Sequence, residues 1–162
     1  MIDFNDAELQ KGYELIPEGT IVRVKISLQR TVEGFLIHTS KNDDDTKFLR
    51  CVCTVLCSAH LNKKIYDNIG IEGSEKFVSV GKSKIRAILE SAKGLAQEDV
   101  SKRAIEARRI DSYEDLDGLA VQLKVGIEKS QSDHYADKNK IAKVLTLSDA
   151  EYIPLGEVGQ CN

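Results

Sequence analysis

Four side chains with metal-binding atoms lie within ten residues of the chain: Cys51, Cys53, Cys57 and His60. Thiolate and imidazole groups at such short spacing are typical zinc ligands. The surrounding residues, however, predict a continuous β-strand, in which Cys51 and Cys57 lie roughly 20 Å apart at about 3.3 Å per residue. Because one ion cannot bridge that distance, we interpret the cysteines as small apolar core side chains and expect no metal site.

A second motif, Gly81-Lys82-Ser83, resembles the end of a phosphate-binding loop. That loop needs a glycine five positions before Gly81, and this chain has Lys76 there. We therefore interpret the motif as the start of a helix. No nucleotide or other cofactor is expected.

The other candidates for catalysis do not form a recognisable set. His38, His60 and His134 lie near expected loops or strand ends, and no Ser or Cys stands in a nucleophile motif. The acidic run at 43–45 is more typical of a solvated loop than of a metal cluster. We therefore do not expect an enzyme, and a metal-dependent nuclease is the least favoured alternative.

Rings and cations on one surface would suit a different chemistry, the binding of a single-stranded nucleic acid. Bases stack on flat rings, and phosphates need Lys or Arg beside them. Within 48–56, Phe48 and Arg50 fall on the face opposite Cys51 and Cys53, although an ordinary solvated face would fit the same pattern. The full candidate set, expected on strand faces or in adjoining loops, is Arg23, Lys25, Arg30, Phe35, Lys47, Phe48, Arg50, Lys63, Tyr66, Lys124, Tyr135, Lys138 and Lys140.

Strands are the main elements that would position these side chains. Residues 20–30 alternate between apolar and polar, and the polar side is basic. Residues 35–39 predict a shorter strand that pairs back as a hairpin, and 48–56 predict the central strand. The segment 58–80 predicts only a short strand and an irregular connection.

Helical periodicity begins after this segment. Apolar residues recur at helical spacing over 85–92, and Gly94 is suited to end that helix. A second amphipathic helix is expected at about 98–109. Alternation then returns and predicts two further strands, at 119–127 and 140–147.

This order, β-β-β-α-β-β, predicts a mainly β fold with a helical insertion, of the α+β class. We expect a five-stranded Greek-key barrel similar to the oligonucleotide/oligosaccharide-binding (OB) fold. The expected divisions are an N-terminal lead-in at 1–18, an OB-like domain at 19–148 with its helical insertion at about 81–110, and a C-terminal tail at 149–162.

Composition and charge limit the partners. The 162 residues, 41% hydrophobic and 30% charged, are enough to bury one core. A formal net charge of −3 excludes a globally basic nucleic-acid binder, although 20–30 and 76–89 are locally basic. No apolar run approaches the roughly 20 residues of a membrane span, and the acidic N-terminus is unlike a signal peptide. We expect a cytoplasmic protein without a membrane partner.

Four short segments, in this order, resemble a widespread phage and prophage family. They are Tyr-Glu-Leu-Ile-Pro-Glu-Gly-Thr at 13–20, Lys-Ile-Arg-Ala-Ile-Leu at 84–89, Leu-Asp-Gly-Leu-Ala-Val at 116–121 and Asp-Lys-Asn-Lys-Ile at 137–141. Members of that family, long labelled as of unknown function, occur with phage replication and recombination genes and are regarded as single-stranded-DNA-binding-like. The resemblance covers roughly 13–147.

The resemblance implies an accessory protein that coats or presents single-stranded DNA in a bacterium or a phage-infected host. Phage replication or recombination proteins would be its partners, and a homo-oligomer stays open. The resemblance implies that the loop at 135–140 and the basic pair Arg23 and Lys25 contact the DNA.

Two functions therefore remain in competition. The leading hypothesis is sequence-tolerant binding of single-stranded DNA in phage-type replication or recombination. The alternative is an OB-like protein-interaction module that acts as a replication, recombination or virion adaptor. The sequence does not decide between DNA and RNA.

Overall fold

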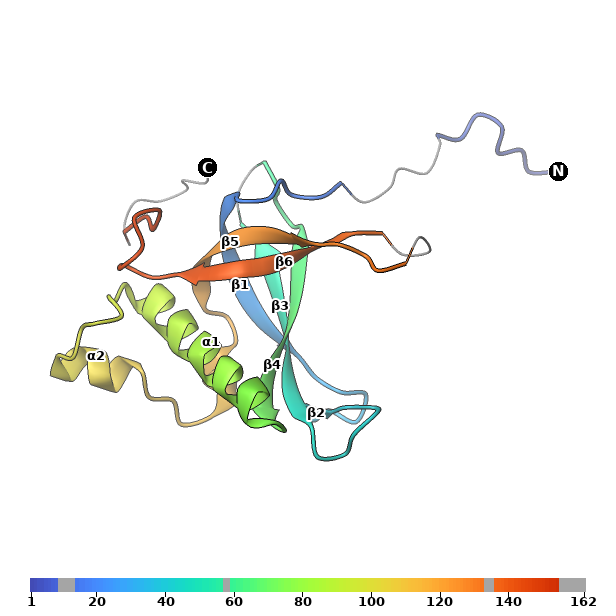
Figure 1. The fold of residues 1–162 in the computed structure, drawn as a ribbon. Helices are drawn as coiled ribbons and strands as arrows, with labels where there is room; N and C mark the ends of the chain where they lie inside the picture. Colours follow the sequence, from blue (N-terminus) through green and yellow to red (C-terminus); the bar gives the residue numbers. More distant parts are fainter. Residues whose placement is uncertain (9–13, 57–58, 133–135, 155–162) are drawn as a thin grey trace.

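The computed structural model describes residues 1–8, 14–56, 59–132 and 136–154. Within these residues the chain forms a mainly β, α+β fold of six antiparallel strands with one long helix between β4 and β5 (Figure 1). The elements are β1 (Ile21–Gln29), β2 (Ile37–Thr39), β3 (Lys47–Val55), β4 (Lys64–Glu72), α1 (Glu75–Lys93), α2 (Lys102–Ala107), the 3-10 helix η1 (Tyr113–Leu116), β5 (Ala120–Glu128) and β6 (Lys138–Leu145). None of the described helices is long and apolar enough to cross a membrane.

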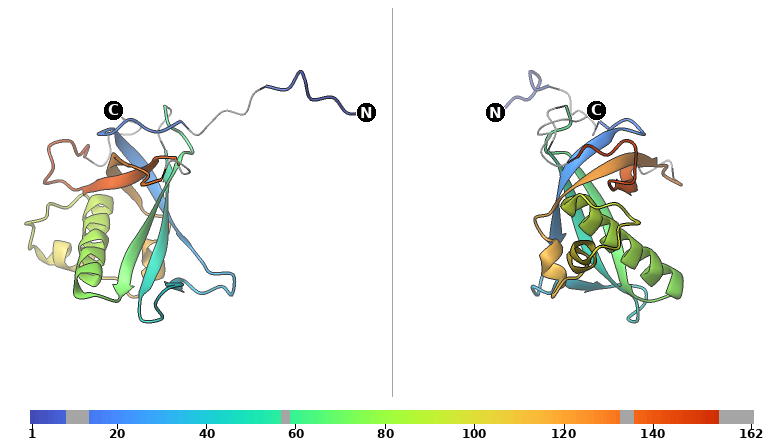
Figure 2. Two further views of the ribbon diagram at one scale, coloured as in Figure 1. Left: turned by 45° about the vertical axis from the view of Figure 1, so that its right-hand side comes forward. Right: turned by 90° about the vertical axis from the view of Figure 1, so that its left-hand side faces the viewer.

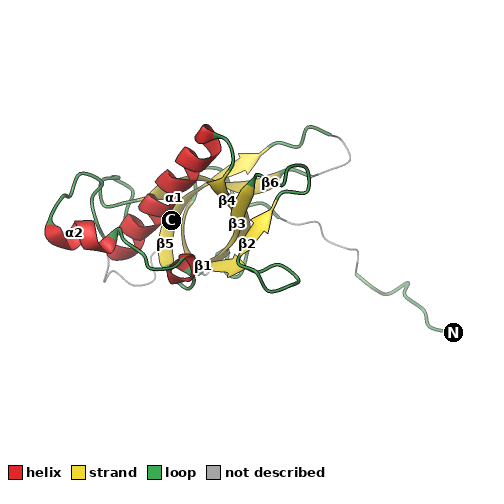
Figure 3. Cartoon of the chain, turned by 90° about the horizontal axis from the view of Figure 1, so that it is seen from below, coloured by secondary structure: helices red, strands yellow, loops and turns green. Residues whose placement is uncertain are grey.

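All six strands belong to one sheet. Its main order is β4-β3-β1-β5-β6, and β2 pairs with the beginning of β3, beyond the point where β1 ends. The strands curve round a common centre, which brings β4 towards β6, and α1 lies along that side of the molecule (Figure 3). Among the residues described, no ladder of hydrogen bonds joins β4 to β6, so bonds do not close the sheet.

The sheet has one strand more than the five expected, and four strands rather than three precede the helices. The additional strand is β4, where only a short strand and an irregular connection were predicted. Its apolar alternation is interrupted at Asp67, whose carboxylate forms an ion pair with Lys84 of α1 at 2.7 Å. Because a charged side chain occupies an inward position, the alternation in the sequence did not predict the full nine residues of this strand.

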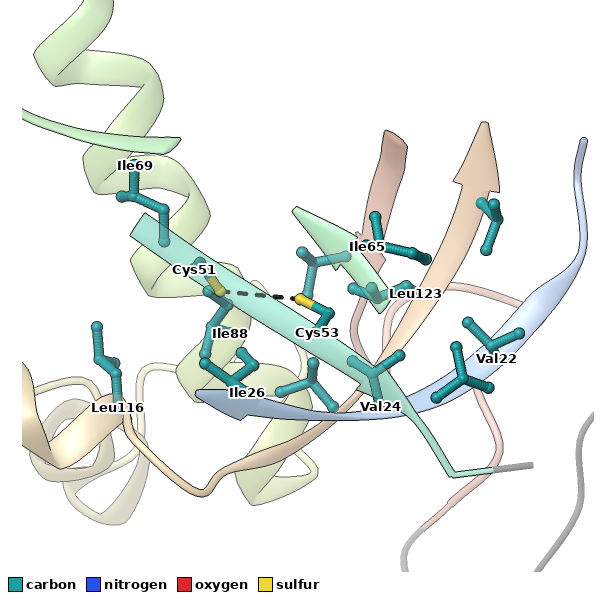
Figure 4. Close-up of a cluster of buried hydrophobic side chains, with 14 of the residues drawn as sticks. Val22, Val24, Ile26, Cys51, Cys53, Ile65, Ile69, Ile88, Leu116 and Leu123 are labelled. Atoms are coloured by element: carbon teal, nitrogen blue, oxygen red, sulfur yellow. Dashed lines mark hydrogen bonds between the residues drawn. The ribbon is translucent and has the colours of Figure 1, made fainter. Parts of the chain in front are cut away.

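The core lies between the inner faces of the strands and α1 (Figure 4). Val22, Val24 and Ile26 of β1 are buried, as are Cys51 and Cys53 of β3, which confirms the alternation predicted for both strands. The two thiol sulfurs lie 3.8 Å apart among apolar side chains. They act as small hydrophobic groups, and Cys57 lies outside the described residues.

The helical part starts earlier than the expected position near 81. Ser74 caps α1, because its hydroxyl accepts a hydrogen bond from the Phe77 N–H at 3.2 Å, and Glu75 places an acid in the first turn. Gly94 ends the helix in the left-handed conformation (φ 68°), as predicted. The second helix, α2, covers only six residues of the expected 98–109.

α1 packs directly on the backbone of β4, beside which it runs in both views of Figure 2. The contact is made by two glycines, since a Cβ added at Gly81 would overlap the carbonyl oxygen of Gly70. Gly81 lies inside α1, which begins at Glu75, so its interpretation as a helix start was wrong. The motif Gly81-Lys82-Ser83 serves close helix–strand packing.

Ordered contacts extend beyond 19–148 at both ends of the domain. Ile16 is fully buried, and its N–H and carbonyl bond to the amide of Asn139 in β6, each at 2.9 Å. At the other end, Tyr152 is buried beside Ile21 and donates its hydroxyl hydrogen to the carbonyl of Ser91 at 2.8 Å. Parts of the expected lead-in and tail thus pack against the sheet.

Candidate nucleic-acid interface

The outer sides of β1, β3 and β4 form one surface, which we call the outer strand face. The strand register arranges its side chains in three rows of neighbours, because adjacent strands lie about 4.8 Å apart and alternate residues share a face. The rows are Lys25, Thr54 and Lys64; Ser27, Val52 and Tyr66; and Gln29, Arg50 and Asn68.

Beside the third row, three side chains stack on one another. The rings of His38 in β2 and Phe48 in β3 have centroids 5.5 Å apart and lie 16° from parallel. The guanidinium of Arg50 lies over the Phe48 ring, 5.9 Å from its centroid. The His38 ring nitrogen Nε2 donates to the carbonyl of Gln29 at 2.6 Å, which ties the stack to β1. Phe48 therefore positions Arg50, and its ring is already in contact with two neighbouring side chains.

Three cations on the outer strand face are available to a ligand. Lys25, Arg50 and Lys64 are exposed, and none of them forms an ion pair with a carboxylate in the described part of the chain. Lys25 and Lys64 flank Thr54 in the first row, and Arg50 occupies the third. These cations give an acidic protein a locally basic surface.

Most of the other predicted cations are engaged elsewhere. Lys63 donates to the carbonyl of Glu14 at 2.8 Å, and Lys140 is exposed on β6. Four more form ion pairs on the surface, namely Arg30 with Glu114, Lys47 with Glu72, Lys124 with Glu151 and Lys138 with Glu128. The structure thus does not bring all of the predicted cations to one face.

Residues 149–153 cover the outer side of β5 and so limit the interface. The side-chain amide of Gln122 bonds to both the N–H and the carbonyl of Ile153, and Tyr152 packs with Ile21 of β1 and Leu145 of β6. Burial raises the pKa of the Tyr152 hydroxyl, although the nearby Arg23 opposes this. Arg23 and Lys124 consequently lie on a partly covered surface next to the open one.

Two of the predicted rings are open to solvent. Tyr66, at the middle of β4, is 61% exposed, and Phe35, in the turn after β1, is 67% exposed. The Phe35 N–H bonds to the Thr31 hydroxyl at 3.0 Å, which holds the turn. Tyr135 lies outside the described residues. Tyr66 is therefore the ring of the set that stands on the outer strand face with its surface open.

A hollow of about 290 Å³ lies at the third row. It is lined by Gln29 of β1, Arg50 of β3, Tyr66, Asp67 and Asn68 of β4, and Lys138 of β6. The lining combines one open ring, two side-chain amides, two cations and the carboxylate of Asp67, which is paired with Lys84, so the hollow offers a stacking surface, polar edges and positive charge together.

Sequence reasoning missed Gln29, His38, Lys64 and Asn68. A signal existed for two of them, because Lys64, Tyr66 and Asn68 are spaced two residues apart, as in a strand. This spacing was not recognised as a strand face, because the segment 58–80 predicted only a short strand. Gln29 has neither a charge nor a ring that would mark it as a binding residue in the sequence, and the stack of His38 with Phe48 depends on the β2–β3 register.

No group of three or more metal-binding side chains occurs among the described residues. The thiol of Cys53 is poorly suited to catalysis, because its hydrogen bond with Cys51 and its burial raise its pKa above the usual value of 9.0. Cys53 also lies in the core and not on the outer strand face.

In the comparisons with known proteins, no protein-family model and no curated protein matches the chain.

Proposed function

We propose that this protein binds single-stranded DNA along the outer strand face, with little preference for base sequence. The observation that carries the proposal is the group of three cations, Lys25, Arg50 and Lys64, which share this face and have no carboxylate partner among the described residues. Cations that neutralise phosphates supply most of the affinity in binding of this kind.

A single strand fits the face better than a duplex. The Tyr66 ring is 61% exposed at the middle of the three strands, and a base can stack on it only when its flat side is free. In a duplex the bases cover one another, and a protein reaches only their edges. The open ring among cations therefore favours an unpaired strand.

The arrangement of the strands supports a finer assignment of the fold. From the strand order β4-β3-β1-β5-β6, with α1 between β4 and β5 in the sequence, we propose an OB-like Greek-key barrel in which β2 is an addition to five basic strands. Ligands of such barrels lie across the middle strands and adjoining loops, which correspond here to β3, β4 and the connection after β1.

The proposed role is that of an accessory protein in phage-type replication or recombination. Support for this role comes from the resemblance of 13–20, 84–89, 116–121 and 137–141 to the phage family. Proteins that coat or present a single strand need no catalytic group, and we accordingly propose a binding protein rather than an enzyme.

The test is the anisotropy of a labelled oligo-dT of about 30 nucleotides, measured at roughly 50 and 200 mM salt beside a duplex of the same length. We expect tight binding of the single strand, weaker binding of the duplex, and a marked loss at the higher salt. The triple variant Lys25→Glu, Arg50→Glu and Lys64→Glu should bind far more weakly. A plot of the logarithm of the binding constant against the logarithm of the salt concentration should become less steep by about two, since each phosphate contact to a single strand contributes about 0.7 to this slope.

A matched control changes the same amount of charge away from the face. Lys82, Lys102 and Arg103 are exposed on α1 and α2, and their replacement by Glu should leave binding close to that of the wild type. Equal losses in both triple variants would show that only net charge matters and would contradict the assignment of the face. No binding of oligo-dT at 50 mM salt would overturn the proposed function.

The alternative, a protein-interaction module, is favoured by a specific feature beside the face. Three apolar side chains are exposed here, Val32 and Phe35 in the connection after β1 and Ile37 at the start of β2. Apolar groups gathered at one turn suit contact with another protein. Substitution of all three by Ser should weaken DNA binding much less than the triple charge reversal does under the leading proposal, and should abolish capture of a replication, recombination or virion protein under the alternative.

A further inference from the structure

We infer that the hollow at the third row is a subsite for one unpaired nucleobase, which it accepts without regard to the identity of the base. The inference rests on the proposed function and goes further, because it assigns a single base-binding position and adds Gln29 and Asn68 to the interface. The hollow, of about 290 Å³, crosses the three strands where Gln29, Arg50 and Asn68 are register partners.

The ring of Tyr66 supplies the stacking surface. Tyr66 stands on the same side of β4 as Asn68, two residues before it, and both side chains are exposed. A base stacked on Tyr66 would therefore present its edge to the polar groups of the next row. Phe48 cannot take this role in the same way, because His38 and Arg50 already stack with its ring.

The amides of Gln29 and Asn68 supply the polar edge. Neither amide forms a side-chain hydrogen bond with another described residue, so both remain open to a ligand. Each amide can donate from its nitrogen and accept at its oxygen, and it can rotate to present either group. Such groups can pair with the edge of any base, which fits binding that tolerates sequence.

The charges around the hollow favour a nucleotide over a neutral molecule. Arg50 has no carboxylate partner in the described chain, and the ion pair of Lys138 with Glu128, 3.4 Å long, is exposed and weak. Asp67 is the acidic group of the lining, and its carboxylate is already neutralised by Lys84 at 2.7 Å. The two cations can therefore hold the phosphates on either side of the base.

The experiment uses a labelled strand of about ten abasic nucleotides, in which thymine, cytosine or adenine is placed at one central position. In the wild-type protein one base should raise the affinity about tenfold over the fully abasic strand, as a single base–aromatic stack does. The three bases should have similar effects. A second and a third base should each add no more than about twofold.

Two pairs of substitutions locate the effect. The double variant Tyr66→Ala and Asn68→Ala, which removes the stacking ring and one amide, should lose most of the gain from the single base and still bind the fully abasic strand as the wild type does. The control, Ser27→Ala and Thr54→Ala, removes polar groups from the same face outside the hollow and should keep the gain. Circular dichroism spectra should show that both variants are folded.

Three results would overturn the inference. Equal gains from every added base would mean that no single subsite exists, and full retention of the gain in the double variant would place the base elsewhere. A strong preference for one of the three bases would contradict an identity-tolerant subsite. If the abasic strand binds but a base adds nothing, the subsite fails while the proposed function stands, whereas failure to bind oligo-dT at low salt removes both.

Discussion

At the scale of single residues, two reactive side chains of this protein are buried, whereas the outer strand face is formed by residues of ordinary type. Cys51 and Cys53 carry reactive groups, but both are buried in the sheet core, 1% exposed. Arg50 and Tyr66 are ordinary surface residues by type, and the strand register gives them a common face with Asn68. The potential of a side chain for chemistry is thus decided by what surrounds it.

The buried thiol of Cys53 predicts a loss of stability in alkali. The hydrogen bond with Cys51, together with burial, raises the pKa of the Cys53 thiol above 9.0 in the folded protein. The folded state keeps a proton that the unfolded state releases, so the free energy of unfolding should fall as the pH rises above about 9. Urea unfolding at pH 8 and pH 10 measures this fall. The decline should be smaller in Cys53→Ala, and an equal decline in both proteins would contradict the prediction.

At the scale of elements, the close contact of α1 with β4 depends on two glycines. Gly81 and Gly70 allow the helix to approach the strand backbone, and Lys84 adds an ion pair with Asp67. A Cβ added at Gly70 would lie 2.5 Å from the carbonyl oxygen of Phe77, so both glycines are needed for this approach. β4, the strand that carries Tyr66, is thereby held closely against α1.

The substitution Gly81→Ala tests this contact, because the two relevant effects have opposite signs. Alanine in an exposed helix position stabilises by about 1 kcal/mol relative to glycine. Here its Cβ would overlap backbone atoms of Gly70, and we expect a net destabilisation of about 1–3 kcal/mol instead. Urea unfolding measures the change, and Lys82→Ala, at the exposed neighbouring position, is the control. A more stable Gly81→Ala protein would show that the helix can move away without cost.

At the scale of the whole molecule, segments from the two ends of the described chain stabilise the sheet. The amide of Asn139 in β6 bonds to both backbone groups of Ile16, across 123 residues of sequence. At the opposite end Tyr152 reaches Ser91 of α1. These contacts hold β6 and β5 in place, and they leave β1, β3 and β4 as the open side for a ligand.

Replacement of Asn139 by Ala should destabilise the whole domain. Two buried backbone groups of Ile16 would lose their partners, and each unsatisfied group costs about 1–3 kcal/mol, so we expect a loss of about 2–6 kcal/mol. The midpoint of urea unfolding should fall in one cooperative transition. Lys140→Ala, at the exposed next position, should change stability by less than about 0.5 kcal/mol. A similar, small effect of both substitutions would mean that Ile16 is not held in this way.

The sequence by itself determined the elements whose patterns are local. Alternation over 20–30 and 48–56 identified β1, β3 and their buried sides, and Gly94 identified the end of α1, because burial on one face of an element imposes its period on the sequence. Only the tertiary structure decided the full extent of β4 and the contact between Gly70 and Gly81. It also decided which cations share a face. Lys25, Arg50 and Lys64 come from three strands, and their proximity depends on register and curvature, which pair residues far apart in the chain and leave no periodic trace within it.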